Sequence, residues 1–511
     1  MNVKPSDETS QPEGAISFGG KTAFGVGAVG EAVFLVLFGG FVTIYYNQVI
    51  GLSNSLIGLA IMLALIGDAI TDPIVGIMSD RWKSKFGRRH PFLIVAPIPL
   101  ALSIFCIFTP PAALTAGADG PSQMPLFAWL ATWTILSRAF LTLYHVPHLA
   151  LGGELTKDQH QRSQLFSANT IFSYGTLAVF TFLAFKVYFA GERVRASDGE
   201  MVPAHLIGEA YGPLVLTACA VVLITIWICA AGTWKYIPQL SQATKDAPRM
   251  SPITFLKDIG STLKNRNYLV LVIGFFFFML TSGIFDTLEV YMFTFFWELD
   301  TDQMAWVRLV GAPAAVTGAL ISPMLMRKYD RKPVMMISLI GGLVFAQLVV
   351  DLRLLGLMVD NDHAALLSIL IVNRAGFAFS LGVSTVVMLS MIGDIIDDSE
   401  LETGERQEGL YYSARAFFAK ASTSFGIFFA NVVLEHYVHM PTEAVPGELD
   451  SDVLFRMGIV AGPVMACAAF VALFFYNKYN LTRERHQEIA TLREARKQSN
   501  DERTATGDVH D

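Results

Sequence analysis

The chain has few charged residues and few cysteines for its length. Only 16% of its 511 residues are Asp, Glu, Lys or Arg, whereas 53% are hydrophobic. The four cysteines, Cys106, Cys219, Cys229 and Cys467, lie singly in apolar stretches and lack the close spacing of a metal site. No Gly-rich phosphate loop and no paired nucleophile and base stand out. We therefore expect no enzymatic activity, no cofactor and no nucleic-acid partner.

Long hydrophobic runs fill most of the chain. A helix needs about 20 apolar residues to cross a bilayer, and only helices satisfy their backbone within lipid over runs of this kind. The sequence predicts twelve such segments, at residues 23–47, 52–79, 91–110, 124–152, 165–190, 211–236, 267–297, 303–326, 333–352, 363–396, 409–436 and 453–477. The expected fold class is therefore an all-α integral membrane protein.

Lys and Arg are missing from alternate connections between these segments. The loops around 47–53, 111–123, 298–302 and 437–452 contain neither residue, whereas basic residues crowd 81–89, 327–332, the central link and the C-terminal tail. Positive charge marks the cytoplasmic side of a membrane protein. We expect both termini and the central link to be cytoplasmic, in a bacterial-type inner membrane, which requires an even number of spans.

The chain divides near its middle into two similar sets of spans. The second and eighth segments each run into a short basic loop followed by a proline, Pro91 or Pro333. Duplicated six-span halves are typical of the major facilitator architecture, which encloses a central cavity. The expected organisation is a cytoplasmic tail (1–22), an N-terminal half (23–236), a cytoplasmic central loop (237–265), a C-terminal half (266–478) and a cytoplasmic tail (479–511).

Two aspartates, Asp68 and Asp72, lie within the second apolar segment. A carboxylate at membrane depth costs about 2.5–3.5 kcal/mol and usually marks a functional site. Residues four apart share one helix face, so the two charges repel unless a cation intervenes. A bound proton or Na⁺ would relieve this repulsion, and so would Arg or Lys from a neighbouring helix.

Three stretches together resemble a known transporter family. They are DAITDPIVGIMSDRWKSKFGRRHPF at 68–92, GDIIDDSELETGERQEGLYYSARAFFAKASTSFG at 393–426 and GAVGEAVFLVLFGGFVTIYYNQVIGLS at 27–53. They resemble the glycoside–pentoside–hexuronide:cation symporter family, which includes melibiose permease. The resemblance extends over nearly the whole chain. It implies a major facilitator fold and symport of a glycoside with Na⁺ or H⁺.

The resemblance assigns a cation site and a neighbouring lysine. Asp68 and Asp72 match the cation-binding carboxylates of the family, which would be the metal ligands if the ion is Na⁺, and Thr71 and Thr142 match further oxygen ligands. Lys420 matches the lysine that the family places between cation and sugar. It could act as a switch that binds the carboxylates until a cation displaces it, or it could form a static ion pair.

The substrate site departs from the family pattern. The acidic residue of the first span is replaced by Ala32, and the family's stacking tryptophans are absent. Arg415 suggests an anionic substrate such as a hexuronide, because a guanidinium binds carboxylates well; alternatively it pairs with Glu31, Asp286 or Glu289. His145 could carry a proton or remain neutral. The candidate substrate-binding residues are Glu31, His145, His148, Thr170, Thr385, Tyr412, Arg415 and Lys420.

Charged residues at the cytoplasmic ends of the spans suggest a gate that pairs the two halves in one state and releases them in the other. The alternative for the basic loop is a simple positive-inside anchor. The candidate gating residues are Asp80, Arg81, Arg88, Arg89, Asp394, Asp397, Arg406 and Glu408. Arg138 and Arg374, each within a span of its own half, are expected to brace neighbouring helices.

A second substrate class remains open at this point. Lysophosphatidylcholine symporters belong to the same broader family, and the loss of sugar-binding acids and tryptophans would suit a more apolar cavity. The sequence therefore predicts a cation-coupled symporter of a small solute, with a lysophospholipid transporter as the alternative. By analogy with the fold, it should work as a monomer in the lipid bilayer.

Overall fold

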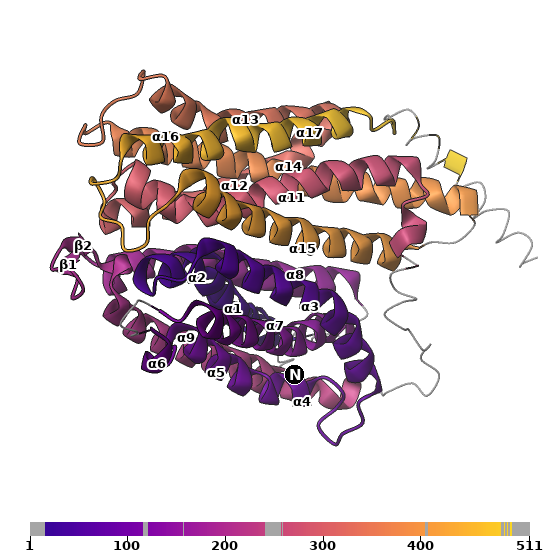
Figure 1. The fold of residues 1–511 in the computed structure, drawn as a ribbon. Helices are drawn as coiled ribbons and strands as arrows, with labels where there is room; N and C mark the ends of the chain where they lie inside the picture. Colours follow the sequence, from indigo (N-terminus) through magenta and orange to yellow (C-terminus); the bar gives the residue numbers. More distant parts are fainter. Residues whose placement is uncertain are drawn as a thin grey trace, which may run out of the picture.

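The computed structural model confirms the predicted class and the number of spans. It describes residues 16–481 except 116–120, 157, 241–256, 258 and 404–406, together with four isolated positions in the tail, 485, 488, 491 and 492. Within this described part, twelve helices or helix pairs are long and apolar enough to cross a membrane. They form two helical bundles that lie side by side (Figure 1).

The N-terminal bundle holds the first six spans. Its helices are α1 (Phe18–Gly40), α3 (Asn54–Arg81), α4 (His90–Val95) with α5 (Pro97–Phe108), α7 (Gln123–Glu154), α8 (Gln159–Leu183) and α9 (Tyr211–Thr233). Shorter turns complete it, namely α2 (Val42–Ile44), α6 (Ala112–Thr115) and the 3₁₀ turns Ala204–Leu206, Gly208–Ala210 and Trp234–Gln239.

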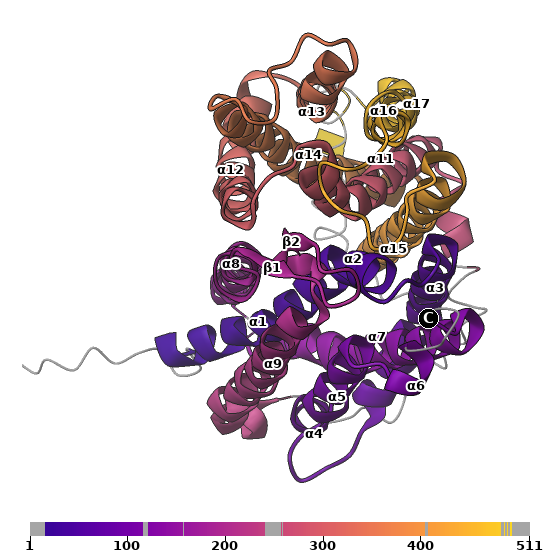
Figure 2. The same ribbon diagram turned by 60° about the vertical axis from the view of Figure 1, so that its left-hand side comes forward.

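The C-terminal bundle repeats this arrangement. Its helices are α11 (Arg266–Tyr291), α12 (Thr301–Lys328), α13 (Arg331–Leu354), α14 (Leu366–Thr403), α15 (Glu408–Val433) and the broken pair α16 (Ser451–Ile459) and α17 (Met465–Asn477). In both views α3 lies along α15 and α8 lies along α12, so these four helices form most of the contact between the bundles (Figure 2).

The first and fifth helices of each bundle end in the same way. Each passes into a single π-turn, at Tyr45–Val49, Ala184–Tyr188, Met292–Phe296 and Leu434–Val438. A fifth π-turn, Val460–Val464, breaks the last span at Gly462, where φ is −100° and ψ is −107°. The four matching helix ends are structural evidence for the internal repeat, because single π-turns are rare and local in origin.

The two ends of the molecule differ in how the bundles meet. We call the end with loops 82–89 and 329–330 the basic end, and the other the neutral end. At the neutral end, Gln48 donates to the carbonyl of Pro441 (2.8 Å), Ser53 donates to Glu435 (2.6 Å) and one hydrophobic core runs through both bundles. At the basic end, the C-terminal bundle has a separate core of its own. The bundles are therefore sealed together at the neutral end.

A short hairpin adds to this seal. The long insert before α9 forms β1 (Glu192–Val194) and β2 (Met201–Pro203), which pair antiparallel. Arg195, held by Asp198 with 2.9 Å between Nε and Oδ2, also donates to the backbone carbonyl of Glu443 at 2.7 Å. Arg195 thus ties the N-terminal bundle to the loop that precedes α16.

Glycines allow the helices of the C-terminal bundle to approach closely. A methyl group added at Gly283 of α11 would collide with the backbone of α15, and one added at Gly426 of α15 would collide with the backbone of α11. Gly318 of α12 and Gly382 of α14 meet the facing backbone in the same way. Small residues are the usual means of close packing between membrane helices, and here they fix α11, α12, α14 and α15 around the central cavity.

Acidification should weaken the neutral end through His205. This residue lies between spans, fully buried, with Nε2 2.8 Å from the Thr294 hydroxyl. Burial, with a smaller effect from the charge of Arg308, lowers the pKa of His205 to about 3. An unfolded histidine takes up its proton near pH 6.5, so the unfolded state binds more protons below that pH and stability falls. We expect a loss of about 1 kcal/mol between pH 6.5 and 5.5.

The measurement is the melting temperature of the purified protein from pH 5 to 8. His205→Gln keeps a hydrogen-bonding side chain without the titration, so the variant should show a flatter profile than the wild type below pH 6.5. Identical profiles for the two proteins would contradict the prediction.

Candidate functional site

Asp68 is buried on α3 and paired with an arginine of the same bundle. Only 2% of its side chain is exposed. Arg138 of α7 places Nε 3.0 Å from Asp68 Oδ2, and its Nη2 donates to the same oxygen. Asp68 Oδ1 is also buried and has no hydrogen-bond partner among the described residues. One carboxylate oxygen is therefore neutralised, and the other remains free to bind a ligand.

Asp72, one helical turn further along α3, binds residues from both bundles. Thr142 of α7 donates to Asp72 Oδ1 at 2.9 Å, and Lys420 of α15 pairs with Oδ2. Lys420 Nζ also lies 3.8 Å from Asp68 Oδ2. The structure thus brings Asp68, Asp72, Thr142 and Lys420 together in one group.

Thr71 is the member of the predicted cation site that does not join this group. Its hydroxyl is directed to the backbone carbonyl of Asp68 in its own helix, at 3.5 Å. This back-bonding is common for threonine within helices. Thr71 borders the carboxylates but does not bind them in this state.

Two large cavities meet at Lys420. One has a volume of about 580 Å³, lies between the bundles and is lined by parts of α1, α2, α3, α7, α8, α11, α12, α14 and α15. The other, of about 550 Å³, follows the groove between α3 and α15 from Met62 to Asp80 and is largely apolar. Asp72 and Lys420 are about one-third exposed, with side-chain exposures of 32% and 35%. We call the first the central cavity and the second the lateral cavity.

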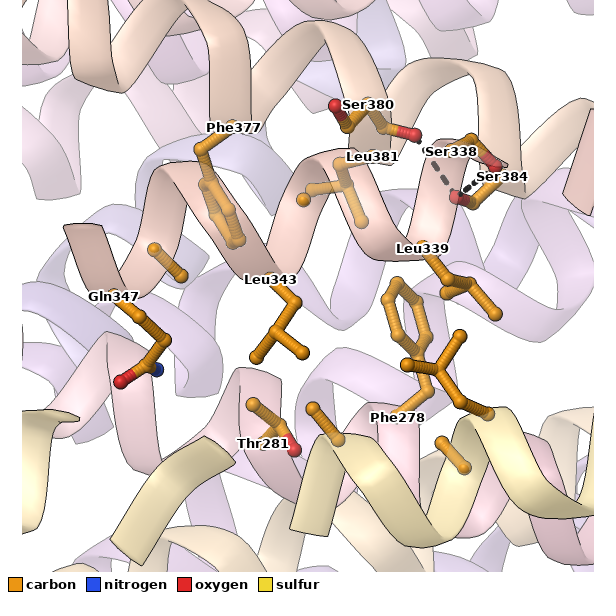
Figure 3. Close-up of a pocket in the computed structure, with 15 residues that line it drawn as sticks. Phe278, Thr281, Ser338, Leu339, Leu343, Gln347, Phe377, Ser380, Leu381 and Ser384 are labelled. Carbon is orange, nitrogen blue, oxygen red and sulfur yellow. Dashed lines mark hydrogen bonds between the residues drawn. The ribbon is translucent and has the colours of Figure 1, made fainter. Parts of the chain in front are cut away.

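A third pocket lies wholly within the C-terminal bundle. It is lined by side chains of α11, α13, α14 and α17, including Phe278 and Leu343, and Ser338 and Ser384 hydrogen-bond at its edge at 2.9 Å (Figure 3). Its volume is about 50 Å³, whereas sites for small ligands measure about 300–1,000 Å³. This pocket is too small for an organic substrate.

The central cavity contains a second charged cluster that sequence reasoning missed. Glu289 of α11 is 7% exposed, accepts a hydrogen bond from Arg308 of α12 and forms an ion pair with Arg374 of α14, with 3.0 Å between Oε1 and Nη1. We expected Arg138 and Arg374 only to connect neighbouring helices, but both also line the central cavity. Their sequence context offered a signal, since Ser137-Arg138-Ala139 and Asn373-Arg374-Ala375 occupy the fourth span of each half. Nothing in the sequence pointed to Arg308.

Of the predicted substrate residues, Lys420 lines both the central and the lateral cavity, whereas four others are partly or fully exposed without lining either cavity. Glu31 and His145 bind each other across α1 and α7, with 2.8 Å between Oε2 and Nδ1. Thr170 and Thr385 are exposed and donate to the backbone carbonyls of Phe166 and Leu381 in their own helices. Tyr174, one turn after Thr170, and Leu381, one turn before Thr385, line the central cavity, whereas the two threonines are not among its lining residues.

Other predicted substrate residues lie away from both large cavities. His148 is completely buried, with Nε2 3.0 Å from the carbonyl oxygen of Phe24, and packs α7 against α1. Arg415 lies over the ring of Phe275 at 5.8 Å, inside the C-terminal bundle. Its proposed partners Glu31 and Glu289 bind other residues, as described above. Tyr412 is on the same part of α15 and is absent from the cavity linings.

The candidate gating residues hold helices within their own bundles in this state. Arg89 binds Asp80, Ser79 (2.6 Å) and Glu154 (2.7 Å), and Arg88 binds Glu154 (2.9 Å). In the C-terminal bundle, Arg331 pairs with Asp394 at 2.9 Å. Arg81, Asp397 and Glu408 lie at the same end of the molecule, and Arg406 falls outside the described residues. The two bundles thus carry matching ion pairs at the basic end.

The chain is similar to known proteins in sequence and in structure. The family model described as MFS/sugar transport protein matches residues 23–483. An uncharacterised symporter of Synechocystis is 25% identical over 95% of this chain and 98% of its own. The raffinose carrier protein of Pediococcus pentosaceus is 22% identical, covering 92% of this chain and 70% of its own. The sodium-dependent lysophosphatidylcholine symporter 1-A of Danio rerio is 21% identical, covering 93% and 87%.

Among solved structures, the nucleoside transporter NupG aligns with a TM-score of 0.59 at 13% identity. The alignment covers 91% of this chain and 100% of that chain. At this level of identity the similarity concerns the fold, and it agrees with the two-bundle arrangement of twelve spans.

Proposed function

Because this chain belongs to the MFS/sugar transport protein family, we propose that it is a secondary active transporter that couples Na⁺ or H⁺ to the movement of a neutral glycoside or similar polar solute. The observation that carries this proposal is the contact of Lys420 with Asp72, which joins the two bundles beside both large cavities. Relatives named as a raffinose carrier and as an isoprimeverose transporter support the substrate class.

The cation site would use Asp68, Asp72 and Thr142. All offer oxygen, the ligand type that hard cations prefer, and Asp68 Oδ1 is buried without a partner in the described chain. In the present state Lys420 supplies the positive charge that Asp72 requires. A cation that binds these oxygens replaces Lys420, and the contact between α3 and α15 changes with it. Such a competition links ion binding to the relative position of the bundles.

Alternating access follows from the difference between the two ends. The neutral end is sealed by a core and hydrogen bonds that both bundles share. We infer that the basic end is cytoplasmic by the positive-inside rule, which makes this an inward-facing state of a monomer in a bacterial-type inner membrane. In the outward-facing state the ion pairs of Arg89 and Arg331 would rearrange to join the two bundles.

The charges around the central cavity favour a neutral substrate over an anion. Four cations, Arg138, Arg308, Arg374 and Lys420, face the four carboxylates of Asp68, Asp72, Asp286 and Glu289. Each cation has a carboxylate partner, so none is left for a hexuronide. Arg415, the residue that suggested an anionic substrate, lies outside the cavity.

The lateral cavity supports the second candidate function. Its lining includes Met62, Ile66, Phe417 and Phe425, and it reaches Asp72 and Lys420 between the bundles. An acyl chain would fit this chemistry with its polar group near Lys420. A lysophospholipid substrate is therefore the alternative, consistent with the named substrate of the Danio rerio relative.

The test is the melting temperature of the purified protein with candidate ligands, each with and without Na⁺. The panel contains isoprimeverose, raffinose, methyl glucuronide and lysophosphatidylcholine. A ligand that binds only the folded state raises the melting temperature, by about 2.7 kcal/mol of stability at one hundred times its Kd. We expect a neutral glycoside to raise it, more strongly with the coupling ion present. A shift with lysophosphatidylcholine alone would overturn the glycoside proposal.

Loss of the Thr142 hydroxyl should weaken cation binding. Thr142→Val removes the donor to Asp72 Oδ1, and a hydrogen bond to a charged group contributes about 1.5–3 kcal/mol. We expect at least a tenfold higher cation concentration for half-maximal uptake, whereas Thr142→Ser should stay close to the wild type. Equal cation dependence in the valine variant and the wild type would show that the hydroxyl is not part of the site.

A further inference from the structure

Asp286 differs from the other carboxylates around the central cavity because it has no bonded partner. It lies on α11, lines the cavity and is exposed to it. Within the part of the chain that the structure describes, no hydrogen bond or ion pair to its carboxylate is present. An ionisable group at membrane depth normally has a partner or a function, so Asp286 requires an explanation that Asp68, Asp72 and Glu289 do not.

The surroundings of Asp286 are rigid and positively charged. Glu289, one turn along α11, fixes Arg308 and Arg374, and the Arg374 guanidinium also lies over the rings of Phe285 (5.2 Å) and Phe377 (5.9 Å). The two rings stack on each other with centroids 4.7 Å apart. These contacts hold the guanidinium groups in place independently of any ligand.

The two arginines retain unused donors. The Nε atoms of Arg308 and Arg374 are buried without a hydrogen-bond partner among the described residues, although both side chains line the cavity and that of Arg308 is only 9% exposed. A buried donor left unsatisfied costs about 1–3 kcal/mol. A ligand that accepts hydrogen bonds from these two side chains would remove this cost.

An acceptor, two fixed donors and aromatic walls define a chemical class of ligand. A carboxylate accepts hydrogen bonds from hydroxyl groups, and an arginine donates to hydroxyl oxygens. Phe377 and, across the cavity on α8, Tyr174 offer apolar faces of the kind that line ligand sites. We propose that Asp286, with Arg308 and Arg374, forms a hydroxyl-binding subsite in the C-terminal bundle that recognises a sugar ring of the substrate; this rests on the proposed function.

The same surroundings argue against other ligands at this position. A metal cation would meet the positive charges of Arg308 and Arg374 beside a single free carboxylate, and no group of three acidic, histidine or cysteine ligands occurs among the described residues. An anion would meet the charge of Asp286. A neutral polyol satisfies both the acceptor and the donors without adding charge. The subsite would replace the acidic grip that the chain lacks at Ala32.

The test compares Asp286→Asn with Asp286→Glu in the full-length protein. Binding of isoprimeverose and raffinose is measured by titration in detergent with Na⁺, and the Na⁺-induced change in melting temperature is recorded in parallel. Asparagine has nearly the same shape as aspartate, but it carries no negative charge and has an NH₂ group in place of one acceptor oxygen. We therefore expect the affinity for the sugar to fall at least tenfold. Glutamate should retain part of the affinity. Asp360→Asn, in a loop where 91% of the Asp360 side chain is exposed, is the matched control and should bind like the wild type.

Sugar analogues identify the interaction itself. The wild type should bind a deoxy sugar less tightly than the parent sugar if the missing hydroxyl is the one that contacts Asp286. For the same deoxy sugar, Asp286→Asn should show a smaller loss. If Asp286 has only a structural role, Asp286→Asn should bind every analogue more weakly by the same factor.

The outcomes separate the two proposals. Unchanged sugar affinity in Asp286→Asn overturns the subsite and leaves the transport proposal standing. Loss of the Na⁺ response together with sugar binding would assign Asp286 to the ion site and also overturns the subsite. If neither sugar binds the wild-type protein, the glycoside proposal fails and the subsite fails with it.

Discussion

Replacing Asp72 by asparagine is expected to abolish concentrative uptake of the substrate while exchange of substrate across the membrane continues. In proteoliposomes with an imposed Na⁺ or H⁺ gradient, the accumulation ratio of the variant should fall to about one. Asp72 is the residue on which the proposed coupling depends, because Lys420 and the cation compete for it. Without the carboxylate, ion binding no longer changes the contact between α3 and α15.

Asp72→Asn should lose more than affinity for the ion. Lys420 Nζ already lies 3.8 Å from Asp68, so in the variant it has one remaining acidic partner, which it shares with Arg138. The ion gradient then has no competing charge to displace, and movement of the bundles becomes independent of it. Asp452→Asn, which alters an exposed pair at the neutral end, should accumulate substrate normally. Uphill accumulation by Asp72→Asn would refute this mechanism.

Replacing Arg138 by methionine is expected to cause the largest loss of stability of any single substitution considered. Asp68 is 2% exposed and would lose the partner that binds Oδ2 twice. Breaking a buried pair by removing one charge typically costs about 3–5 kcal/mol, because the remaining charge stays buried. We expect a marked fall in the melting temperature and in the yield of folded protein.

The double variant Arg138→Met with Asp68→Asn provides the control for this explanation. It removes both charges, so most of the lost stability should return even though the ion pair is gone. Arg456→Met, in a partly exposed pair with Asp452, should change stability by less than about 1 kcal/mol. A single variant as stable as the wild type would mean that Lys420 or water can neutralise Asp68 alone.

The fold was predictable because length and hydropathy decide which segments cross a membrane. All twelve predicted segments correspond to spans, with differences at their ends. The first span begins at Phe18 rather than at residue 23 and ends in the π-turn Tyr45–Val49. The last span is broken at Gly462. The apolar pattern does not indicate such breaks, although Pro463, next to Gly462, is a local cause of the last one.

The proposed cation site could be predicted to the extent that its residues share a helix or match the family. Asp68 and Asp72 are neighbours on α3 by spacing alone, and the resemblance to the symporter family pointed to Thr142 and Lys420. The role of Arg138 was underestimated because its partner is on another helix, 70 residues away in sequence. Arg308 and Arg374 are likewise joined only by the fold, through Glu289.

The error over Arg415 has the same origin. A cation one turn from Lys420 suggested a substrate contact, but five residues along a helix turn a side chain to a different face. Arg415 therefore faces α11 and Phe275, whereas Lys420 faces the other bundle. The helix period indicated the separation, but the sequence did not show which of the two faces borders the cavity.

The seal at the neutral end has a thermal consequence. Its apolar core includes Phe41, Tyr46 and Trp297 from the two bundles, and opening this end would expose such side chains to water. Exposure of apolar surface raises the heat capacity, so the balance between the two conformations should vary with temperature along a curve rather than a straight line. Because hydrophobic burial weakens on cooling, cold conditions should shift the population toward the form that is open at this end, independently of any ligand.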